Sequence, residues 1–371
     1  MKLRSISHLW LVLIVSISRV EGKPQPLIID TDLGQDMDDS WSIALLLKNP
    51  DVDVKLIVTA SRCTTGKANV LAKFLTDVGR TDVSIGIGIP TAPAFTTFGD
   101  RWCNGTGSES ECGRGFFVGP AAPYAHGFDL RSYRGASFHD GVAAMADVLK
   151  IQPEATIVAL GPFTNLASLQ ARFPGVSGRA HLLCMGGSIR VGWQGVPPAI
   201  AEYNVRTDTE ASQHVVRTAA SWASFTMAPL DTNFGLQLRG EGYQKFAQAA
   251  KSSENPLAAS VLAQYYAWYD FGCSHGVWCS PAIVPYAPSN ASTTLYDVQP
   301  AFMLTAGGWS SLQTSLLHVD VNASGFVEEV PDTHSGGWLN VTLGWAEGGQ
   351  VKFFRTLMAY LVGTDLALVQ I

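Results

Sequence analysis

The sequence predicts an α/β protein, with a single large domain whose mostly parallel central sheet is covered by helices on both faces. Apolar runs alternate with helical patterns through the first two thirds of the chain, and this alternation is typical of parallel strands connected by helices. Strands are predicted near residues 27–32, 54–60, 83–89, 155–160, 180–185 and 223–228. Helices are predicted near residues 38–49, 66–78, 138–151, 163–172 and 208–219.

The ends of the first two elements are marked by proline and by acidic residues. The first strand is an apolar run bounded by Pro26 and by an acidic turn. The helix after it has apolar residues at helical spacing up to Asn49, and Pro50 ends it.

Two later stretches depart from the alternation. Residues 95–137 are rich in glycine and aromatic residues, and we expect a loop over the active site there. Between residues 312 and 343 the apolar period becomes two, which predicts an antiparallel hairpin region before a last helix near 350–362.

A cluster of aspartates directly follows the first strand. The cluster consists of Asp30, Asp32, Asp36, Asp38 and Asp39. In open α/β sheets ligands bind at the carboxyl ends of the strands, and crowded carboxylates repel one another unless a cation or hydrogen-bond donors compensate. Ca2+ accepts about six to eight oxygen ligands, so the sequence favours a metal-dependent hydrolase.

Other interpretations of the cluster need different chemistry. A solvated acidic turn with helix-capping aspartates would need no ligand. An EF-hand loop does not fit, because the glycine comes fifth counted from Asp30, and the sixth residue counted from Asp36 is Trp41. A phosphatase with an aspartyl nucleophile also begins with a strand followed by Asp-x-Asp, as at Asp30 and Asp32, and stays an alternative.

The pattern Asp-Thr-Asp-x-Gly-x-Asp-x-Asp-Asp resembles the N-terminal signature of the inosine-uridine-preferring nucleoside hydrolase family, in the variant with one extra residue before the Asp-Asp pair. Four later segments resemble further blocks of that family in the same order: 159–167, 185–187, 201–204 and 295–297. The resemblance spans nearly the whole mature chain. It implies that the chain hydrolyses the N-glycosidic bond of ribonucleosides to free base and ribose.

The resemblance also implies a role for individual residues. The implied Ca2+ ligands are Asp32, Asp39, Asp297 and the backbone carbonyl of Leu160. Asp32 is also the expected general base, and Tyr296 stands in the place of the acid that protonates the leaving base. The implied substrate contacts are Asp38, Met185, Glu202 and Asn204, with Gln194 as the nearest amide in the preceding loop. Asp30 and Asp36 are expected to support the site.

Ordinary structural roles compete with several of these assignments. Thr164 or Asn165 can be a helix cap, and methionine more often fills a core than contacts a substrate. Glu202 and Asn204 lie two residues apart, so on an extended segment both would face the same side.

The chain departs from the family pattern at four positions. Leu33 replaces a proline, and Tyr296 replaces a histidine, although a phenol with a reference pKa near 10 is a weaker acid than imidazolium. Cys63 stands where an active-site asparagine is often found, and the asparagine expected in the loop before Ala201 is absent. Base preference therefore stays open.

The N-terminus predicts secretion. Residues 1–22 carry basic residues, a short apolar core and a small-residue cleavage site, as signal peptides do, so residues 23–371 would form the mature catalytic domain, without a membrane anchor. Sequons at Asn104, Asn290, Asn322 and Asn340 are expected acceptors of N-glycans.

Six cysteines in an oxidising compartment favour pairing. The expected local disulfides are Cys103–Cys112 and Cys273–Cys279. Cys184 is expected to be a buried thiol, and Cys63 to pack without reacting or to line the site.

Charge bears on the partner. The formal net charge is −6, which argues against nucleic acid as a partner because binding to phosphates depends on clustered cations. A neutral nucleoside fits better. The non-enzymatic alternative is a secreted Ca2+-dependent nucleoside or sugar binder without turnover, and the sequence leaves the oligomeric state open, a homo-oligomer included.

Overall fold

The computed structural model describes residues 23–91, 122–274 and 288–363. One ten-stranded sheet runs through this part of the chain, in the order β4-β3-β2-β1-β5-β6-β7-β10-β8-β9. The strands are β1 (Gln25–Thr31), β2 (Val52–Thr59), β3 (Ser84–Ile87), β4 (Ser137–Phe138), β5 (Thr156–Ala159), β6 (His181–Met185), β7 (Ser224–Ala228), β8 (Leu312–Val321), β9 (Val327–Glu329) and β10 (Gly337–Trp345). The predicted fold class is confirmed.

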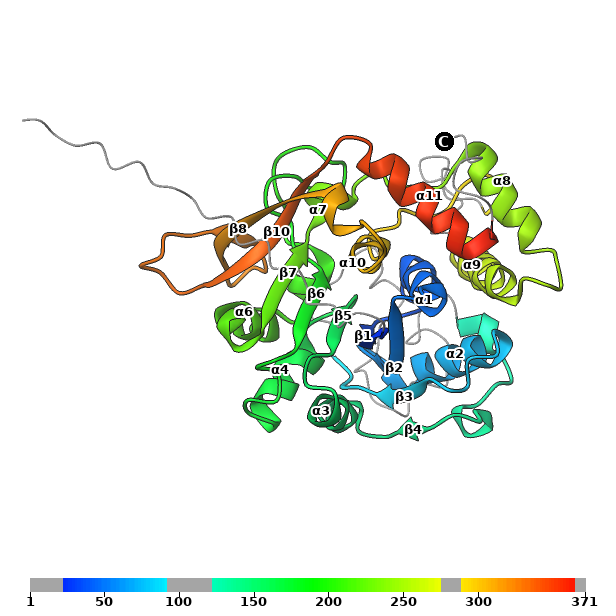
Figure 1. The fold of residues 1–371 in the computed structure, drawn as a ribbon, viewed down its shortest axis with the longest axis horizontal. Helices are drawn as coiled ribbons and strands as arrows, with labels where there is room; N and C mark the ends of the chain where they lie inside the picture. The colour runs from blue at the N-terminus through cyan, green and yellow to red at the C-terminus, as the bar shows by residue number, and fades with distance from the viewer. Residues whose placement is uncertain (1–22, 92–121, 275–287, 364–371) are drawn as a thin grey trace, which may run out of the picture.

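The strands from β4 to β7 pair in parallel, and β10 joins them through a short parallel pairing with β7. β8 pairs with β10 in the antiparallel sense, and β9 pairs with β8 in the same way. The predicted hairpin region is therefore confirmed, but β10 also extends the central sheet. The β8–β10 ribbon projects from one end of the molecule (Figure 1).

Helices cover both faces of the sheet (Figure 1). The α-helices are α1 (Asp38–Lys48), α2 (Thr64–Asp77), α3 (Gly141–Ile151), α4 (Thr164–Arg172), α5 (Tyr203–Thr207), α6 (Thr209–Arg217), α7 (Leu230–Asn233), α8 (Gly240–Ala249), α9 (Pro256–Ser274), α10 (Val298–Met303) and α11 (Gly349–Val362). Short 3-10 helices are η3 (Ala122–Ala125), η4 (Leu130–Ser132), η5 (Ala219–Ser221) and η7 (Trp309–Ser311). No helix of the described residues is long and apolar enough to cross a membrane.

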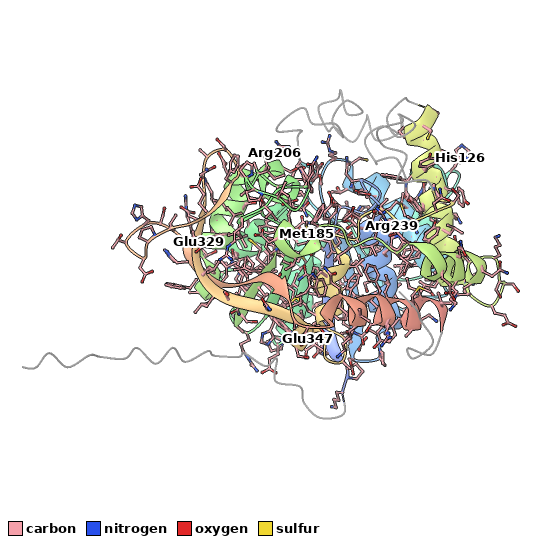
Figure 2. All side chains as sticks on the ribbon, turned by 90° about the horizontal axis from the view of Figure 1, so that it is seen from above. His126, Met185, Arg206, Arg239, Glu329 and Glu347 are labelled. Atoms are coloured by element: carbon pink, nitrogen blue, oxygen red, sulfur yellow. The ribbon has the colours of Figure 1, made fainter. Side chains whose placement is uncertain are left out.

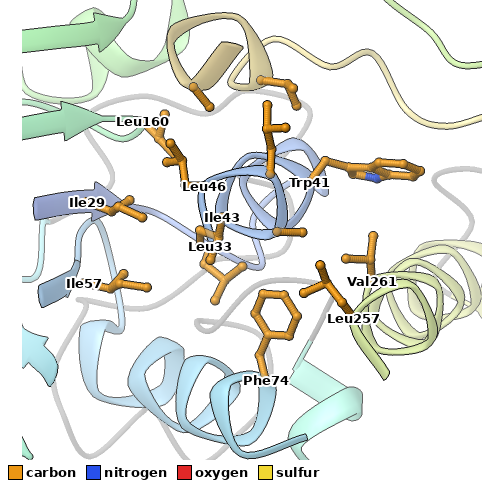
Figure 3. Packing of buried hydrophobic residues seen from close by; sticks show 14 of the residues in the cluster. Ile29, Leu33, Trp41, Ile43, Leu46, Ile57, Phe74, Leu160, Leu257 and Val261 are labelled. Atoms are coloured by element: carbon orange, nitrogen blue, oxygen red, sulfur yellow. The ribbon is translucent and has the colours of Figure 1, made fainter. Parts of the chain in front are cut away.

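Alternate residues of β1 pack in two separate hydrophobic cores. Leu27 and Ile29 pack with residues of α1, α2 and α9, and Figure 3 shows Ile29 beside Leu33, Ile43 and Leu46. Ile28 points to the other face and packs with residues of α3, α4 and α6. Because both faces are buried, the strand is a continuous apolar run and not an alternating one.

The cysteines divide into two kinds. Cys184 is a free, buried thiol, as expected. Cys63 and Cys273 are disulfide-bonded, so the expectation that Cys63 is an unpaired packing residue is wrong. Cys103, Cys112 and Cys279 lie outside the described residues, and so do the signal segment and Asn104. The expected pairings stay predictions.

Candidate active site

The site lies at the carboxyl edge of the central strands. Asp30 is level with Ala159 in the pairing of β1 with β5. The first residue after β5, Leu160, donates its N–H to the Asp30 carbonyl at 2.7 Å. The chain then approaches β1 closely at Gly161, where a side-chain Cβ would lie 3.0 Å from the Asp32 nitrogen. Gly161 therefore leaves room for the turn that carries Asp32.

Three carboxylates from distant parts of the chain meet beside this turn. Asp38 and Asp39 lie in the first turn of α1, and Asp297 directly precedes α10. Their oxygen atoms lie within 4.8 Å of one another, and all three residues are buried. The Asp297 N–H also donates to the Asp38 carboxylate at 3.3 Å. The structure thus groups Asp38, which we expected to hold the sugar, with the expected metal ligands Asp39 and Asp297.

Asp32 borders this group. Its carboxylate faces Asp39, whose own carboxylate accepts a hydrogen bond from the Thr31 hydroxyl. Burial raises the pKa of Asp32, and the positive charges of Lys67 and Arg62 oppose that rise. Asp32 is therefore the carboxylate of the site with two cationic side chains nearby.

The buried acids shift one another's pKa upward. Burial raises the pKa of Asp38, Asp39 and Asp297 well above the ordinary range, and repulsion from the neighbouring carboxylates adds to the rise. Burial likewise raises the pKa of Asp36 to about 6, although its carboxylate accepts the Met37 N–H at 2.6 Å. Such a group ionises fully only when a cation balances it. The donor set, made of carboxylate oxygens, fits a hard divalent cation.

Asp30, near the end of β1, is held in place by a hydrogen bond from α4. Asn165 of α4 donates its amide N–H to one carboxylate oxygen of Asp30 at 2.8 Å, and accepts the Ile89 N–H at 2.9 Å. The other carboxylate oxygen of Asp30 is buried without a hydrogen-bond partner. Burial raises the pKa of Asp30 to about 7. Asn165 therefore lies inside the first turn of α4 and links Asp30 to the chain after β3, whereas Phe163 occupies the cap position.

Glu202 begins a helix, so the expectation that Glu202 and Asn204 share an extended segment is wrong. The Glu202 carboxylate accepts the N–H groups of Gly187 and Asn204, both at 2.9 Å, and that of Val205 at 3.2 Å. Burial raises its pKa to about 7, and these donors act in the opposite direction. Glu202 thus fixes the loop after β6 against the start of α5.

Asn204 joins the ends of two strands. Its amide donates to the Leu160 carbonyl at 2.8 Å, to the Met185 carbonyl at 3.3 Å and to the Met185 sulfur at 3.4 Å. The Leu160 carbonyl, which we expected to bind a metal, accepts a hydrogen bond from Asn204. Asn204 therefore contacts both of the other predicted residues, Leu160 and Met185.

Aromatic side chains lie on the side of the site next to Asp297. Tyr296 is partly buried and meets Trp193 edge to face, with ring centroids 5.5 Å apart. Gln194, beside Trp193, is exposed. His126, which belongs to the predicted loop, is exposed and lies well away from Met185 (Figure 2). The predicted loop over the site runs from residue 95 to residue 137, and its part up to residue 121 lies outside the described residues.

Sequence reasoning missed Lys67 and Arg62. Lys67 is fully buried and donates to the backbone carbonyl of Asp32. A signal for it exists, because Lys67 shares a helical face with the apolar residues Val70, Leu71 and Phe74. Nothing comparable in the sequence marks Arg62.

Arg62 lies in a strained turn after β2. Ser61 and Arg62 both have left-handed backbone conformations, with φ of 63° and 52°, and both are buried. Residues other than glycine rarely adopt this left-handed backbone conformation. Backbone strain of this kind is concentrated at functional sites. The Arg62 N–H donates to the Thr91 hydroxyl at 3.2 Å, and its Nε donates to the Tyr203 hydroxyl at 3.3 Å. The turn thus holds a buried cation near Asp32.

The fold and the site define an α/β protein with a buried, oxygen-rich ligand site at the carboxyl edge of a parallel sheet. Residues 27–338 match the family described as inosine-uridine preferring nucleoside hydrolase. The chain belongs to this family.

Individual relatives agree with the family match. The chain is 31% identical over 297 residues to a pyrimidine-specific ribonucleoside hydrolase, RihA, from Salmonella newport, covering 78% of this chain and 84% of the relative. It is 26% identical over 302 residues to the RihA of Photobacterium profundum, covering 79% and 86%.

Solved structures share the fold at lower identity. A plant nucleoside hydrolase, PpNRh1, superposes with a TM-score of 0.66 at 18% identity, covering 92% of this chain and 100% of the other. A purine-preferring ribonucleoside hydrolase from Gardnerella vaginalis superposes with a TM-score of 0.64 at 18% identity, covering 91% and 99%.

Proposed function

We propose that this chain is a secreted, Ca2+-dependent N-ribohydrolase that cleaves the N-glycosidic bond of ribonucleosides to free base and ribose. The observation that carries the proposal is the buried group Asp38, Asp39 and Asp297, in a chain of the nucleoside hydrolase family. These residues, with Asp32 beside them, would hold the cation. When bound, Ca2+ would orient a water molecule, lower its pKa and hold sugar hydroxyls.

Asp32 is the general base in this proposal. A base must be ionised before it can take a proton from the attacking water. The charges of Lys67 and Arg62 favour the ionised form of Asp32. The Lys67 ammonium also holds the backbone of Asp32 through its carbonyl, which keeps the base in place.

Negative charge stabilises the sugar as the bond breaks. Hydrolysis of an N-ribosyl bond gives the sugar oxocarbenium character, so fixed negative groups favour the transition state over the neutral ground state. Asp38 and Glu202 supply that charge. The three backbone N–H groups that bind Glu202 keep its carboxylate oriented before the substrate arrives.

Tyr296 is the acid that protonates the leaving base in this proposal, as the resemblance to the family implies. Its phenol is a weak acid at neutral pH, so proton donation from Tyr296 helps a poor leaving group less than imidazolium would. The proposal therefore favours substrates whose base leaves with little help.

The base itself is open. The Salmonella relative is named as pyrimidine-specific, and the Gardnerella structure as purine-preferring. We propose the class of substrate, a neutral ribonucleoside, and leave the base to experiment.

Secretion is the part of the proposal that concerns where the protein acts. It stands on the signal-like residues 1–22 and on the four sequons. Of these sequons, Asn290 is exposed. Asn322 is partly buried, and its amide donates to Glu328 at 2.7 Å.

The aspartyl-phosphatase alternative has less support. It requires Asp30 to attack a phosphate, but Asp30 is fully buried and is bonded to Asn165. A nucleophile needs access to its substrate.

The test is a ribose-release assay on inosine, uridine, adenosine and cytidine, with and without chelator. We expect release from at least one nucleoside, loss on chelation and recovery on adding Ca2+. Calorimetric binding of a nucleoside without any ribose release would instead show a binder. Release of phosphate from a generic ester with Mg2+, and no ribose, would favour the phosphatase.

A further inference from the structure

A fully buried lysine lies against the carboxylate site. Lys67 comes from the first turns of α2, and none of its surface is exposed. Its ammonium group donates to the backbone carbonyl of Asp32. The neighbours on its helical face, Val70, Leu71 and Phe74, are buried apolar residues. Lys67 is therefore turned inward, toward the site.

A buried ammonium is unfavourable unless opposite charges compensate it. For Lys67 these charges are the carboxylates of Asp32 and Asp39, since its positive charge lowers the pKa of both. The same two carboxylates belong to the proposed cation site. Lys67 and a bound cation would thus act on the same negative charge.

We propose that Lys67 is a resident counter-cation of the carboxylate site, which keeps the site assembled without metal and lowers its affinity for Ca2+. The inference rests on the cation of the proposed function. Loss of a residue next to a ligand site usually weakens binding of the ligand, and the inference predicts the opposite for Lys67. Removal of Lys67 should tighten Ca2+ binding, because it removes a repulsive positive charge.

A simpler role would give the opposite result. If Lys67 only anchors the Asp32 turn through its hydrogen bond, its loss would loosen the turn and weaken Ca2+ binding. The two roles separate when the charge is removed and the hydrogen-bond donor is kept.

The experiment compares two neutral variants with a matched control. Lys67→Met removes both the charge and the donor, while Lys67→Gln removes the charge and keeps a donor. Lys73→Met removes the same charge from the same helix, but Lys73 is partly exposed and pairs with Asp77 at 2.6 Å. Chelated, full-length protein is titrated with Ca2+ by calorimetry, and its thermal unfolding is followed with and without Ca2+.

We expect both Lys67 variants to bind Ca2+ about five- to tenfold more tightly than the unmodified protein, since one charge several ångströms away acts on a divalent ion even at the dielectric constant of water. By linkage, Ca2+ should raise their unfolding temperature more than that of the unmodified protein. Lys73→Met should match the unmodified protein in both measurements.

Four results would overturn the inference. Weaker binding by Lys67→Met with unchanged binding by Lys67→Gln would show an anchor. Unchanged binding by both variants would show that the charge does not act on the cation. Failure of both to fold even with Ca2+ would show that the cation does not replace Lys67 as the counter-charge. Folding of the variants only with Ca2+ would support the inference. Absence of Ca2+ binding to the unmodified protein would overturn the proposed cation as well, whereas ribose release is read separately.

Discussion

Without the proposed cation, the stability of the folded protein should fall as the pH rises. Asp30 shows the effect most simply, because burial raises its pKa from the ordinary 3.8 to about 7. A raised pKa means that the folded protein holds the proton more tightly than the unfolded chain. The stabilisation is therefore complete below about pH 4 and is lost as the pH rises toward 7.

The size of the loss follows from the shift. A difference of about three pKa units corresponds to about 4 kcal/mol, at roughly 1.4 kcal/mol per unit. That figure is a ceiling for Asp30 alone, and the pKa values of Asp38, Asp39 and Asp297 shift in the same direction. Domains are stable by only about 5–15 kcal/mol. The chelated protein should therefore have a markedly lower free energy of unfolding at pH 7 than at pH 5.

Urea unfolding between pH 4 and pH 8 measures this directly, with chelator and with saturating Ca2+. Ca2+ should flatten or reverse the slope, because it binds the ionised carboxylates. Asp30→Asn should make the chelated profile less steep, and it should raise the free energy of unfolding near pH 8 by about 2–4 kcal/mol, within that ceiling. Asp140→Asn is the control, since Asp140 is exposed and pairs with Arg172, which lowers its pKa. Superposed profiles with and without Ca2+, or a chelated protein that grows more stable toward pH 7, would refute the reasoning.

Three further predictions follow from single features. Gly161→Ala should lower the turnover of ribose release about tenfold with little change in KM. The new Cβ would lie 3.0 Å from the Asp32 nitrogen and would displace the general base. Unchanged turnover would show that the turn has room for a side chain. Tyr296→His should raise turnover on purine nucleosides more than on nitrophenyl riboside, because acid help is worth about 10²- to 10⁴-fold for poor leaving groups. Equal effects on both substrates would place the acid elsewhere. Mass analysis of protein from its native host should find a mature chain beginning near Lys23 with at least one N-glycan, and an intact Met1 without glycans would contradict secretion.

The strands were predictable because their burial on both faces leaves an uninterrupted apolar signal. β1 carries that signal in Leu27, Ile28 and Ile29, which fill two different cores. Helix α9 gave no such signal, since Pro256–Ser274 is apolar on most of its surface and lacks the polar stripe that marks an amphipathic helix.

The aspartates between residues 30 and 39 were predictable because they are close in the sequence, whereas Asp297 was grouped with them only through the resemblance of residues 295–297 to a family block. The surroundings of these carboxylates were not predictable, because they depend on side chains that tertiary packing brings in. Lys67 looks like an ordinary helix lysine until α2 packs against the Asp32 turn. Glu202 looks like part of an extended segment until its carboxylate binds three backbone N–H groups.

The most direct test of the central claim is ribose release by metal-free protein, before and after Ca2+ is restored, for the unmodified chain and for Asp39→Asn. Asp39 joins the group formed by Asp38 and Asp297, so its replacement by asparagine removes one of the three grouped carboxylates. We predict no release without metal, recovery of the unmodified protein with Ca2+, and little or no recovery of Asp39→Asn. Full ribose release by a preparation shown by elemental analysis to hold no metal would contradict the account.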